Sequence, residues 1–229
     1  RVVMVTGAGG SIGAELCRQI AKFRPARLVL FDISEAALYE IRTALGDEFT
    51  QLPMVTVVGD VKHAALVEDV LEREKPNVVF HAAAYKHVPL MEETNAWQAV
   101  RNNAYGTWVI ARASVAAKVE KFVLVSTDKA VNPTSVMGAS KRLAEIVCQT
   151  LQGGGTAFVV VRFGNVFGSA GSVIPRFREQ IARGGPVTVT HPDITRYFMS
   201  LSEATQLLLQ AGLMGRSGEI LVLDMGDPV

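Results

Sequence analysis

Short apolar runs alternate with helix-patterned segments along most of this chain of 229 residues. The runs are rich in β-branched residues and are apolar on both faces, as in strands that helices cover from both sides. We expect strands at residues 2–5, 27–31, 54–58, 77–80, 121–125 and 157–161. This alternation of strands and helices predicts an α/β fold, built as a Rossmann-type, doubly wound parallel sheet.

Three glycines, Gly7, Gly10 and Gly13, fall between the first strand and the first helix, as the turn that holds a pyrophosphate requires. We expect Gly7 to allow the tight turn, Gly10 to let phosphates approach the backbone, and Gly13 to let helix and strand pack closely. Ser11 and Ile12 open the helix, whose N-terminus then faces the phosphates. The pattern predicts a dinucleotide site.

Two acidic residues at strand ends bear on the adenosine half of that site. Asp32 ends the second strand about twenty residues after the glycines, the spacing of a carboxylate that binds the ribose hydroxyls. Since an acid there repels a 2′-phosphate, Asp32 favours NAD over NADP. Asp60 and Val61 follow the third strand and can reach the adenine edge. Asp60 can equally be the N-cap of the next helix, and the two interpretations stay open.

The alternation loosens after residue 162. Loops and a short helix precede a small strand at 187–190, a helix at 204–213 and a last strand at 219–223. We therefore divide the chain into a NAD-binding Rossmann domain at 1–162 and a small C-terminal substrate-binding lobe at 163–229, interleaved with the last sheet elements. Because the chain starts directly in a strand, we expect a fragment of a longer protein with a truncated lobe. Earlier in the chain, we expect a helix from about Ser34 to a stop at Gly46 and a long helix over 96–118.

Composition excludes several classes of function. A formal net charge of +1 argues against a nucleic-acid-binding or membrane-surface protein. Cys17 and Cys148 lie in helix-like apolar patterns, where we expect buried free thiols of a reducing cytoplasm. The chain has no apolar run of the roughly 18–20 residues that span a bilayer, no signal peptide and no metal-ligand spacing. We therefore expect a cytoplasmic protein that binds no metal.

A hydroxyl, a carboxylate and an amine stand together at Thr127, Asp128 and Lys129, directly after the fifth strand. The carboxyl end of a strand is where an open α/β sheet presents groups to a ligand. Met137 and Lys141 lie one turn apart on the helix-patterned segment that follows.

The motifs resemble those of the extended short-chain dehydrogenase/reductases: the glycine turn, HAAA at 81–84, NAYGT at 103–107 and the lysine at 141. The chain is more closely similar to one branch, the nucleotide-sugar 4,6-dehydratases of bacterial polysaccharide and glycan biosynthesis. AAYKHVPLME at 83–92, STDKAVNPT at 126–134, VMG at 136–138 and TRYFM at 195–199 carry this second resemblance. In that branch UDP-N-acetylglucosamine is the usual substrate.

The resemblance implies a lyase that oxidises C4 of the sugar, eliminates water across C5 and C6 and returns the hydride to C6. The product is the UDP-4-keto-6-deoxy sugar, and the tightly bound NAD is recycled. Cofactor contacts are implied for Ala82, Ala83, Ala84 and Lys141, with Lys141 on the nicotinamide ribose. Among the catalytic residues, Thr127 binds the C4 oxygen, Asp128 is the acid for the C6 hydroxyl and Lys129 the base for the C5 proton.

Met137 occupies the catalytic position where most of the superfamily has tyrosine. A thioether cannot exchange a proton at neutral pH, so the C4 proton must go to Asp128, Lys129 or a water chain. The three alternatives stay open. One subgroup of these dehydratases carries methionine, and it is often membrane-anchored through an N-terminal region and retains the C5 configuration. The resemblance thus places a full-length protein with such an anchor at the cytoplasmic face of the inner membrane.

The resemblance also implies a set of substrate-binding residues: Lys86, His87, Asn103, Asn165, Val173, Arg176 and Arg196. Asn165 and Arg196 match positions on the UDP diphosphate, and Val173 and Arg176 begin a helix that covers the uracil. Lys86 can instead be a solvated lysine, and His87 a core histidine. We expect a homo-oligomer, with Trp97 and Trp108 in the core or at a subunit interface. The rival functions are a nucleotide-sugar 4-epimerase and a catalytically silent NAD-binding regulatory module.

Overall fold

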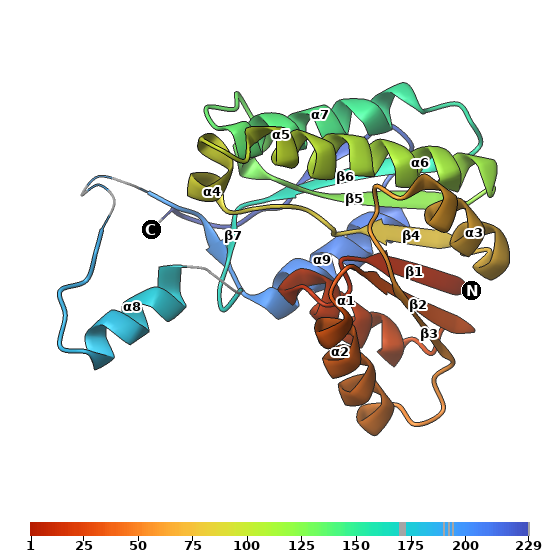
Figure 1. Cartoon of the computed structure of the whole chain (residues 1–229), viewed down its shortest axis with the longest axis horizontal. Coiled ribbons are helices and arrows are strands. Elements are labelled where there is room, and N and C mark those ends of the chain that lie inside the picture. Colours follow the sequence, from red (N-terminus) through yellow and green to blue (C-terminus); the bar gives the residue numbers. More distant parts are fainter. Residues whose placement is uncertain (170–172, 190, 192, 194, 229) are drawn as a thin grey trace.

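In the computed structural model, one seven-stranded sheet runs through the molecule in the order β3-β2-β1-β4-β5-β6-β9 (Figure 1). Every neighbouring pair is parallel. The structure describes residues 1–169, 173–189, 191, 193 and 195–228. The strands are β1 (Val2–Thr6), β2 (Arg27–Asp32), β3 (Met54–Val58), β4 (Val78–His81), β5 (Lys121–Thr127), β6 (Ala157–Phe163) and β9 (Ile220–Val222). The predicted fold class is confirmed.

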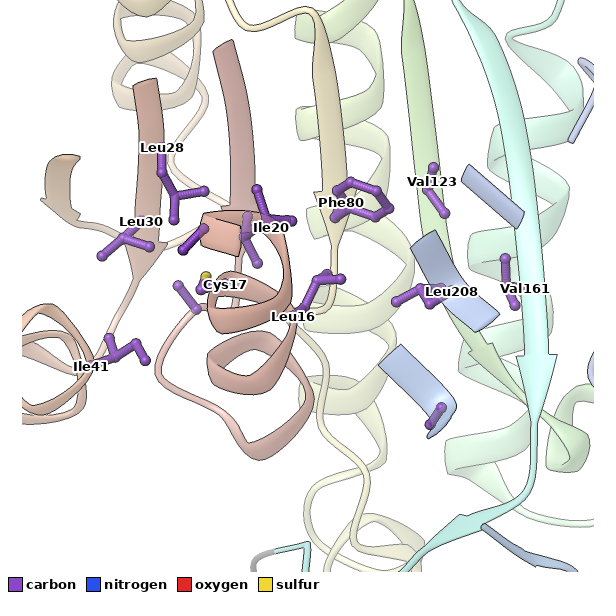
Figure 2. Close-up of a cluster of buried hydrophobic side chains, with 14 of the residues drawn as sticks. Leu16, Cys17, Ile20, Leu28, Leu30, Ile41, Phe80, Val123, Val161 and Leu208 are labelled. Carbon is purple, nitrogen blue, oxygen red and sulfur yellow. The ribbon is translucent and has the colours of Figure 1, made fainter. Parts of the chain in front are cut away.

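Helices cover both faces of the sheet, because successive side chains of each strand point to opposite faces. Leu28 and Leu30 of β2 join the core under α1 (Ser11–Lys22), α2 (Glu35–Glu48) and α9 (Leu201–Met214). Val29 and Phe31 of the same strand join the core under α3 (Ala64–Glu74), α6 (Gly106–Ala116) and α7 (Val136–Thr150). Figure 2 shows the first core, where α1 side chains, Leu16 among them, lie close to side chains of the sheet.

The long helix expected over 96–118 contains a π-helical turn. It consists of α5 (Ala96–Ala99), the π turn η1 (Val100–Tyr105) and α6. The π turn buries Asn102 and Asn103. A short helix that the sequence did not predict, α4 (Val88–Glu92), follows the loop after β4. π turns occur frequently at functional sites, and this one faces the loop between β4 and α4.

Two expectations for local structure were wrong. Residues 187–189 form no strand, and Thr190 lies outside the described residues. Gly46 does not stop α2, which continues to Glu48. A Cβ at Gly46 would meet no atom within 4 Å, so the glycine is simply a partly exposed helical position.

The C-terminal part is divided between the sheet and a separate small unit. β7 (Asn165–Val166) pairs with β8 (Phe198–Met199), and α8 (Val173–Ala182) lies between them in the chain. Figure 1 shows α8 apart from the main sheet, whereas α9 returns to pack on α1. β9 then pairs with β6, so residues after 162 do interleave with the sheet. The boundary at 162 stays a prediction.

Candidate active site

The strand order turns back between β1 and β4, and ligands of such sheets bind at the carboxyl ends beside that point. The glycine turn lies there. Gly7 has φ of +71°, and a Cβ on it would lie 2.6 Å from the Ala83 nitrogen. A Cβ on Gly13 would lie 1.9 Å from the Gly7 oxygen. Gly10 is the N-cap of α1, which Ser11 and Ile12 begin. Both Gly7 and Gly13 are therefore required by backbone contacts alone.

A pocket of about 300 Å³ opens beside this turn. The loops after β1, β2, β3 and β4 line it, together with the end of β2 and one residue each of α2 and η1: Gly7, Gly9, Gly10, Phe31, Asp32, Ile33, Ser34, Ala37, Gly59, Asp60, Val61, Ala82, Ala83, Ala84, Tyr85 and Asn102. Asp32 accepts hydrogen bonds from the Gly9 nitrogen (2.9 Å) and the Ser34 nitrogen (2.9 Å). The carboxylate thus helps to shape the turn and still faces the pocket.

Asp60, which we expect near the adenine, is held by a lysine that the sequence did not point to. Lys62 donates to Asp60 from its Nζ (2.9 Å) and from its backbone nitrogen (2.8 Å). Burial raises the pKa of Asp60, but the contacts with Lys62 outweigh it and lower the pKa overall. The N-cap of α3 is His63, so the alternative of Asp60 as that N-cap was wrong. Lys62 also donates to Asn102 (3.1 Å).

The polar residues after β5 form one hydrogen-bonded cluster. The Thr127 hydroxyl donates to Asp128 Oδ1 (2.8 Å), and Lys129 Nζ donates to the same oxygen (2.9 Å). Lys129 Nζ also donates to Asn165 Oδ1 (3.1 Å), which follows β6, the neighbour of β5. The side chains of Asp128 and Lys129 are 38% and 31% exposed. The hydroxyl and the amine thus both contact the carboxylate, and the acid and the amine are open to a ligand.

Lys141 and Met137 are both buried on the first turns of α7. Lys141 Nζ donates to the Val125 carbonyl (2.7 Å), and burial lowers the pKa of Lys141 to about 8. Met137 packs with Met91 of α4 and Ala99 of α5 in a small apolar cluster. The Met137 side chain therefore has a packing role in this structure.

Asn103 differs from the expectation of a substrate contact. Its Oδ1 accepts from the Tyr85 nitrogen (2.8 Å), and its Nδ2 donates to the Tyr85 carbonyl (2.9 Å) and to Ser140 Oγ (2.9 Å). The residue is 0% exposed. Asn103 braces the loop after β4 against α7, and no atom of it is open to a sugar.

The other expected substrate residues are carried by loops and by α8. Lys86 and His87 are exposed, which rules out the core histidine for His87. Arg196 Nη1 donates to the Thr195 carbonyl (2.9 Å), and Arg176 is exposed on α8. Val173 begins α8, but its side chain lies outside the described residues. Figure 1 shows α8, the helix that carries Arg176, apart from the main sheet.

The predictions for residues away from the site are confirmed in part. Cys17 and Cys148 are buried free thiols, as predicted. Trp97 is 67% exposed, and Trp108 stacks on Tyr105 at 5.7 Å between ring centroids, so the core interpretation of Trp97 was wrong. Within the described ranges, no helix combines the length and apolarity needed to cross a membrane. The same ranges contain no group of three or more histidine, cysteine or acidic residues arranged to hold a metal ion.

A family model described as "Polysaccharide biosynthesis protein" matches residues 3–229. The chain is 52% identical over 232 residues to the capsular polysaccharide biosynthesis protein CapD of Staphylococcus aureus, covering 100% of this chain and 39% of CapD. It is 34% identical to the UDP-glucose 4-epimerase of Rickettsia rickettsii, covering 97% of this chain and 65% of the epimerase. The chain therefore spans less than half the length of CapD.

Solved structures share the fold. Pen from Bacillus thuringiensis superposes with a TM-score of 0.93 at 33% identity, covering 100% of this chain and 70% of Pen. A double mutant of DesIV, a dTDP-glucose 4,6-dehydratase of Streptomyces venezuelae solved with NAD and DAU bound, gives a TM-score of 0.88 at 24% identity. That match covers 99% of this chain and 76% of DesIV. At that identity the second similarity supports the fold alone.

Proposed function

The chain belongs to the family of polysaccharide biosynthesis proteins, and we propose that it is a NAD-dependent nucleotide-sugar 4,6-dehydratase acting on UDP-N-acetylglucosamine. The family agrees with the polysaccharide biosynthesis expected from the sequence motifs. One observation supports the reaction most strongly: Thr127, Asp128 and Lys129 are in mutual contact at the carboxyl end of β5. A dehydratase needs an acid at C6 and a base at C5, and this cluster supplies both.

The direction of the Thr127 hydrogen bond favours one route for the C4 proton. Because the hydroxyl donates to Asp128, Thr127 can accept the C4 proton while passing its own proton to the carboxylate. Asp128 then gives that proton to the C6 hydroxyl, which leaves as water. The route needs no tyrosine, in keeping with the buried Met137.

Lys129 completes the proton balance. In its neutral form it takes the C5 proton and later returns a proton to C5. Asp128 and Lys129 each end the cycle in the protonation state in which they began it.

The pocket beside the glycine turn suits the adenosine and pyrophosphate part of the dinucleotide. Gly7 and Gly13 leave room at the backbone that a Cβ would fill, and the N-terminus of α1 favours an anion. No lysine or arginine is among the described residues that line the pocket, and Asp32 is, which supports NAD over NADP. NAD held there would supply the acceptor for the C4 hydride and the hydride donor for C6. Lys141 uses one donor on the Val125 carbonyl and keeps two for the nicotinamide ribose.

The substrate's diphosphate needs cations outside this cluster. We assign it to Lys86 and Arg196, since a guanidinium and an ammonium suit phosphate oxygens. Asn165 reaches the diphosphate with its amide nitrogen, because its oxygen is bonded to Lys129. The uracil assignment of Val173 and Arg176, the exposed His87 and the homo-oligomer stay predictions.

The rival enzyme is a nucleotide-sugar 4-epimerase, which the 34% identity to the Rickettsia rickettsii epimerase favours. An epimerase oxidises C4 but removes no water, so it has no use for an acid and an amine at C5 and C6. A silent NAD-binding module would fit Met137 but leaves the connected Thr127–Lys129 cluster without a role.

Proton NMR of UDP-N-acetylglucosamine in D₂O, with NAD and the full-length protein, tests the proposal. A dehydratase gives a new C6 methyl signal, deuterium at C5 and no net NADH. An epimerised sugar without a methyl signal would establish the rival enzyme. Bound NAD with no turnover of this or other UDP-sugars would favour the silent module.

A further inference from the structure

A buried carboxylate that the proposed reaction does not use joins α7 to the end of β5, the strand that ends at Thr127. Glu145 of α7 is 0% exposed and accepts four hydrogen bonds. Its Oε1 accepts from Ser126 Oγ (2.6 Å) and Arg162 Nε (2.8 Å). Its Oε2 accepts from Arg162 (2.6 Å) and Arg142 (2.9 Å). Burial raises the pKa of Glu145, but these donors outweigh it and lower the pKa, so the group is an anion at neutral pH.

The four bonds join the elements that carry the active-site groups. Ser126 of β5 directly precedes Thr127, and in the sheet register it lies opposite Arg162 of β6. Lys141 lies one helical turn before Glu145 on α7. A single carboxylate thus ties the end of β5 to β6 and to the helix that bears Lys141. Buried charged networks of this kind are held to one geometry, because a broken member leaves an unpaired charge.

We propose that Glu145 is a positioning residue, which holds the Thr127–Lys129 segment in register against α7 and supplies the negative charge that keeps Lys141 protonated at neutral pH. This inference rests on the proposed function for its effect on turnover, and on the structure alone for its effect on Lys141.

The surroundings of Lys141 support the charge assignment. Burial lowers the pKa of Lys141 to about 8, and Cys148 and Glu145 are the neighbours that act in the opposite direction. Burial raises the pKa of the Cys148 thiol to about 12, so Cys148 is neutral where Lys141 titrates. His81, which also faces Lys141, has a pKa of about 3 because it is buried, and it is neutral as well. Among these three described neighbours, only Glu145 carries a negative charge near pH 8.

The charge effect can be measured without substrate. In full-length protein labelled with ¹³C-lysine, the Lys141 signal is the one missing from Lys141→Arg, and its titration midpoint should lie at about 8. Glu145→Gln should move that midpoint to lower pH by about one unit, since a nearby opposite charge changes a pKa by about one to three units. Glu145→Asp, which keeps the charge, should restore it. An unchanged midpoint in Glu145→Gln would overturn the proposal.

The positioning effect is measured by turnover. Ser126→Ala removes the bond from the strand and leaves both arginine pairs, and it should lower kcat about ten- to hundredfold at unchanged KM. Ser114→Ala is the matched control, because Ser114 is equally buried and its hydroxyl donates to the Ile110 carbonyl on α6 (2.7 Å), away from the site. Equal kcat in Ser126→Ala and Ser114→Ala would overturn the proposal. This test still applies if Glu145→Gln fails to fold. A wild type without turnover would defeat the proposed function, while the Lys141 titration would still decide this one.

Discussion

The glycine turn after β1 and the polar cluster after β5 lie at the same edge of the sheet but are built by opposite means. The turn depends on the absence of side chains, because any Cβ on Gly7 or Gly13 would come within 3 Å of a backbone atom. The cluster depends on side chains that are present: the Thr127 hydroxyl and the Lys129 amine donate to Asp128 Oδ1 at 2.8 Å and 2.9 Å. The turn is fixed by the backbone, and the cluster by hydrogen bonds between flexible groups.

This difference predicts how each region responds to change. A clash with backbone atoms cannot relax without moving the strand or the helix, so it damages folding and binding together. A lost hydrogen bond between partly exposed groups costs only about 0.5–1.5 kcal/mol of stability, so it damages the chemistry and spares the fold. Substitutions in the turn and in the cluster should therefore separate binding from turnover.

The largest effect is expected for Gly13→Ala. The added Cβ would lie 1.9 Å from the Gly7 oxygen, so we expect a loss of roughly 1–3 kcal/mol or more in the free energy of unfolding, and no NAD binding. Gly46→Ala is the control, because that helical glycine meets nothing within 4 Å and alanine there should stabilise by about 0.5–1 kcal/mol. Urea unfolding and NAD titration of both variants measure this. Similar behaviour of the two would remove the steric basis of the comparison.

Next in size is Lys129→Met. Loss of a general base lowers turnover by about 10²- to 10⁴-fold, and we expect this with NAD affinity and melting temperature near the wild-type values. Lys22→Met, on the exposed end of α1, serves as the control for loss of a surface charge. Initial rates of methyl formation by NMR give the turnover. A Lys129→Met variant that also loses NAD would show that the two regions do not act separately.

The sequence predicted the turn well because its constraints are local. Gly7, Gly10, Gly13 and Asp32 stand at fixed spacing around one strand and one helix, and the strands follow from apolar periodicity. The π turn, α4 and the β7–β8 pair were missed because they depend on tertiary contacts such as the bonds between Asn103 and Tyr85. Propensity alone carries no signal for them.

The cluster was predicted only in part. Thr127, Asp128 and Lys129 are consecutive and easily found, but the contact from Lys129 to Asn165 requires that β6 lies beside β5. Glu145 was missed, although an acidic residue on the buried face of α7, one turn after Lys141, was a visible signal. Buried polar residues on an amphipathic helix reveal their partners only once the neighbouring strands are known.

A third prediction concerns the titration of the buried Lys141. The pKa of Lys141 is lowered from 10.5 to about 8 by burial, so between those values the unfolded chain binds more protons than the folded one. Lys141 therefore makes stability rise with pH from about 8 to 10.5, by at most about 1.4 kcal/mol per pH unit. Lys141→Met should lack this part of the rise. Urea unfolding of both proteins across that range gives the difference. Parallel curves would contradict the lowered pKa of Lys141 in the folded protein.

The smallest effect, and the sharpest test of the contrast, is expected for Asp32→Asn. Asp32 belongs to the turn region but acts through its side chain, which accepts from the Gly9 and Ser34 nitrogens. Asparagine keeps the size and one acceptor oxygen but removes the charge, so we expect about tenfold weaker NAD binding and a smaller preference over NADP. Titration with both dinucleotides measures this, and Asp47→Asn on the exposed end of α2 is the control. If Asp32→Asn lost as much stability as Gly13→Ala, the Asp32 carboxylate would be needed to fold the turn. A side chain as well as backbone contacts would then fix the turn, and the contrast with the cluster would no longer hold.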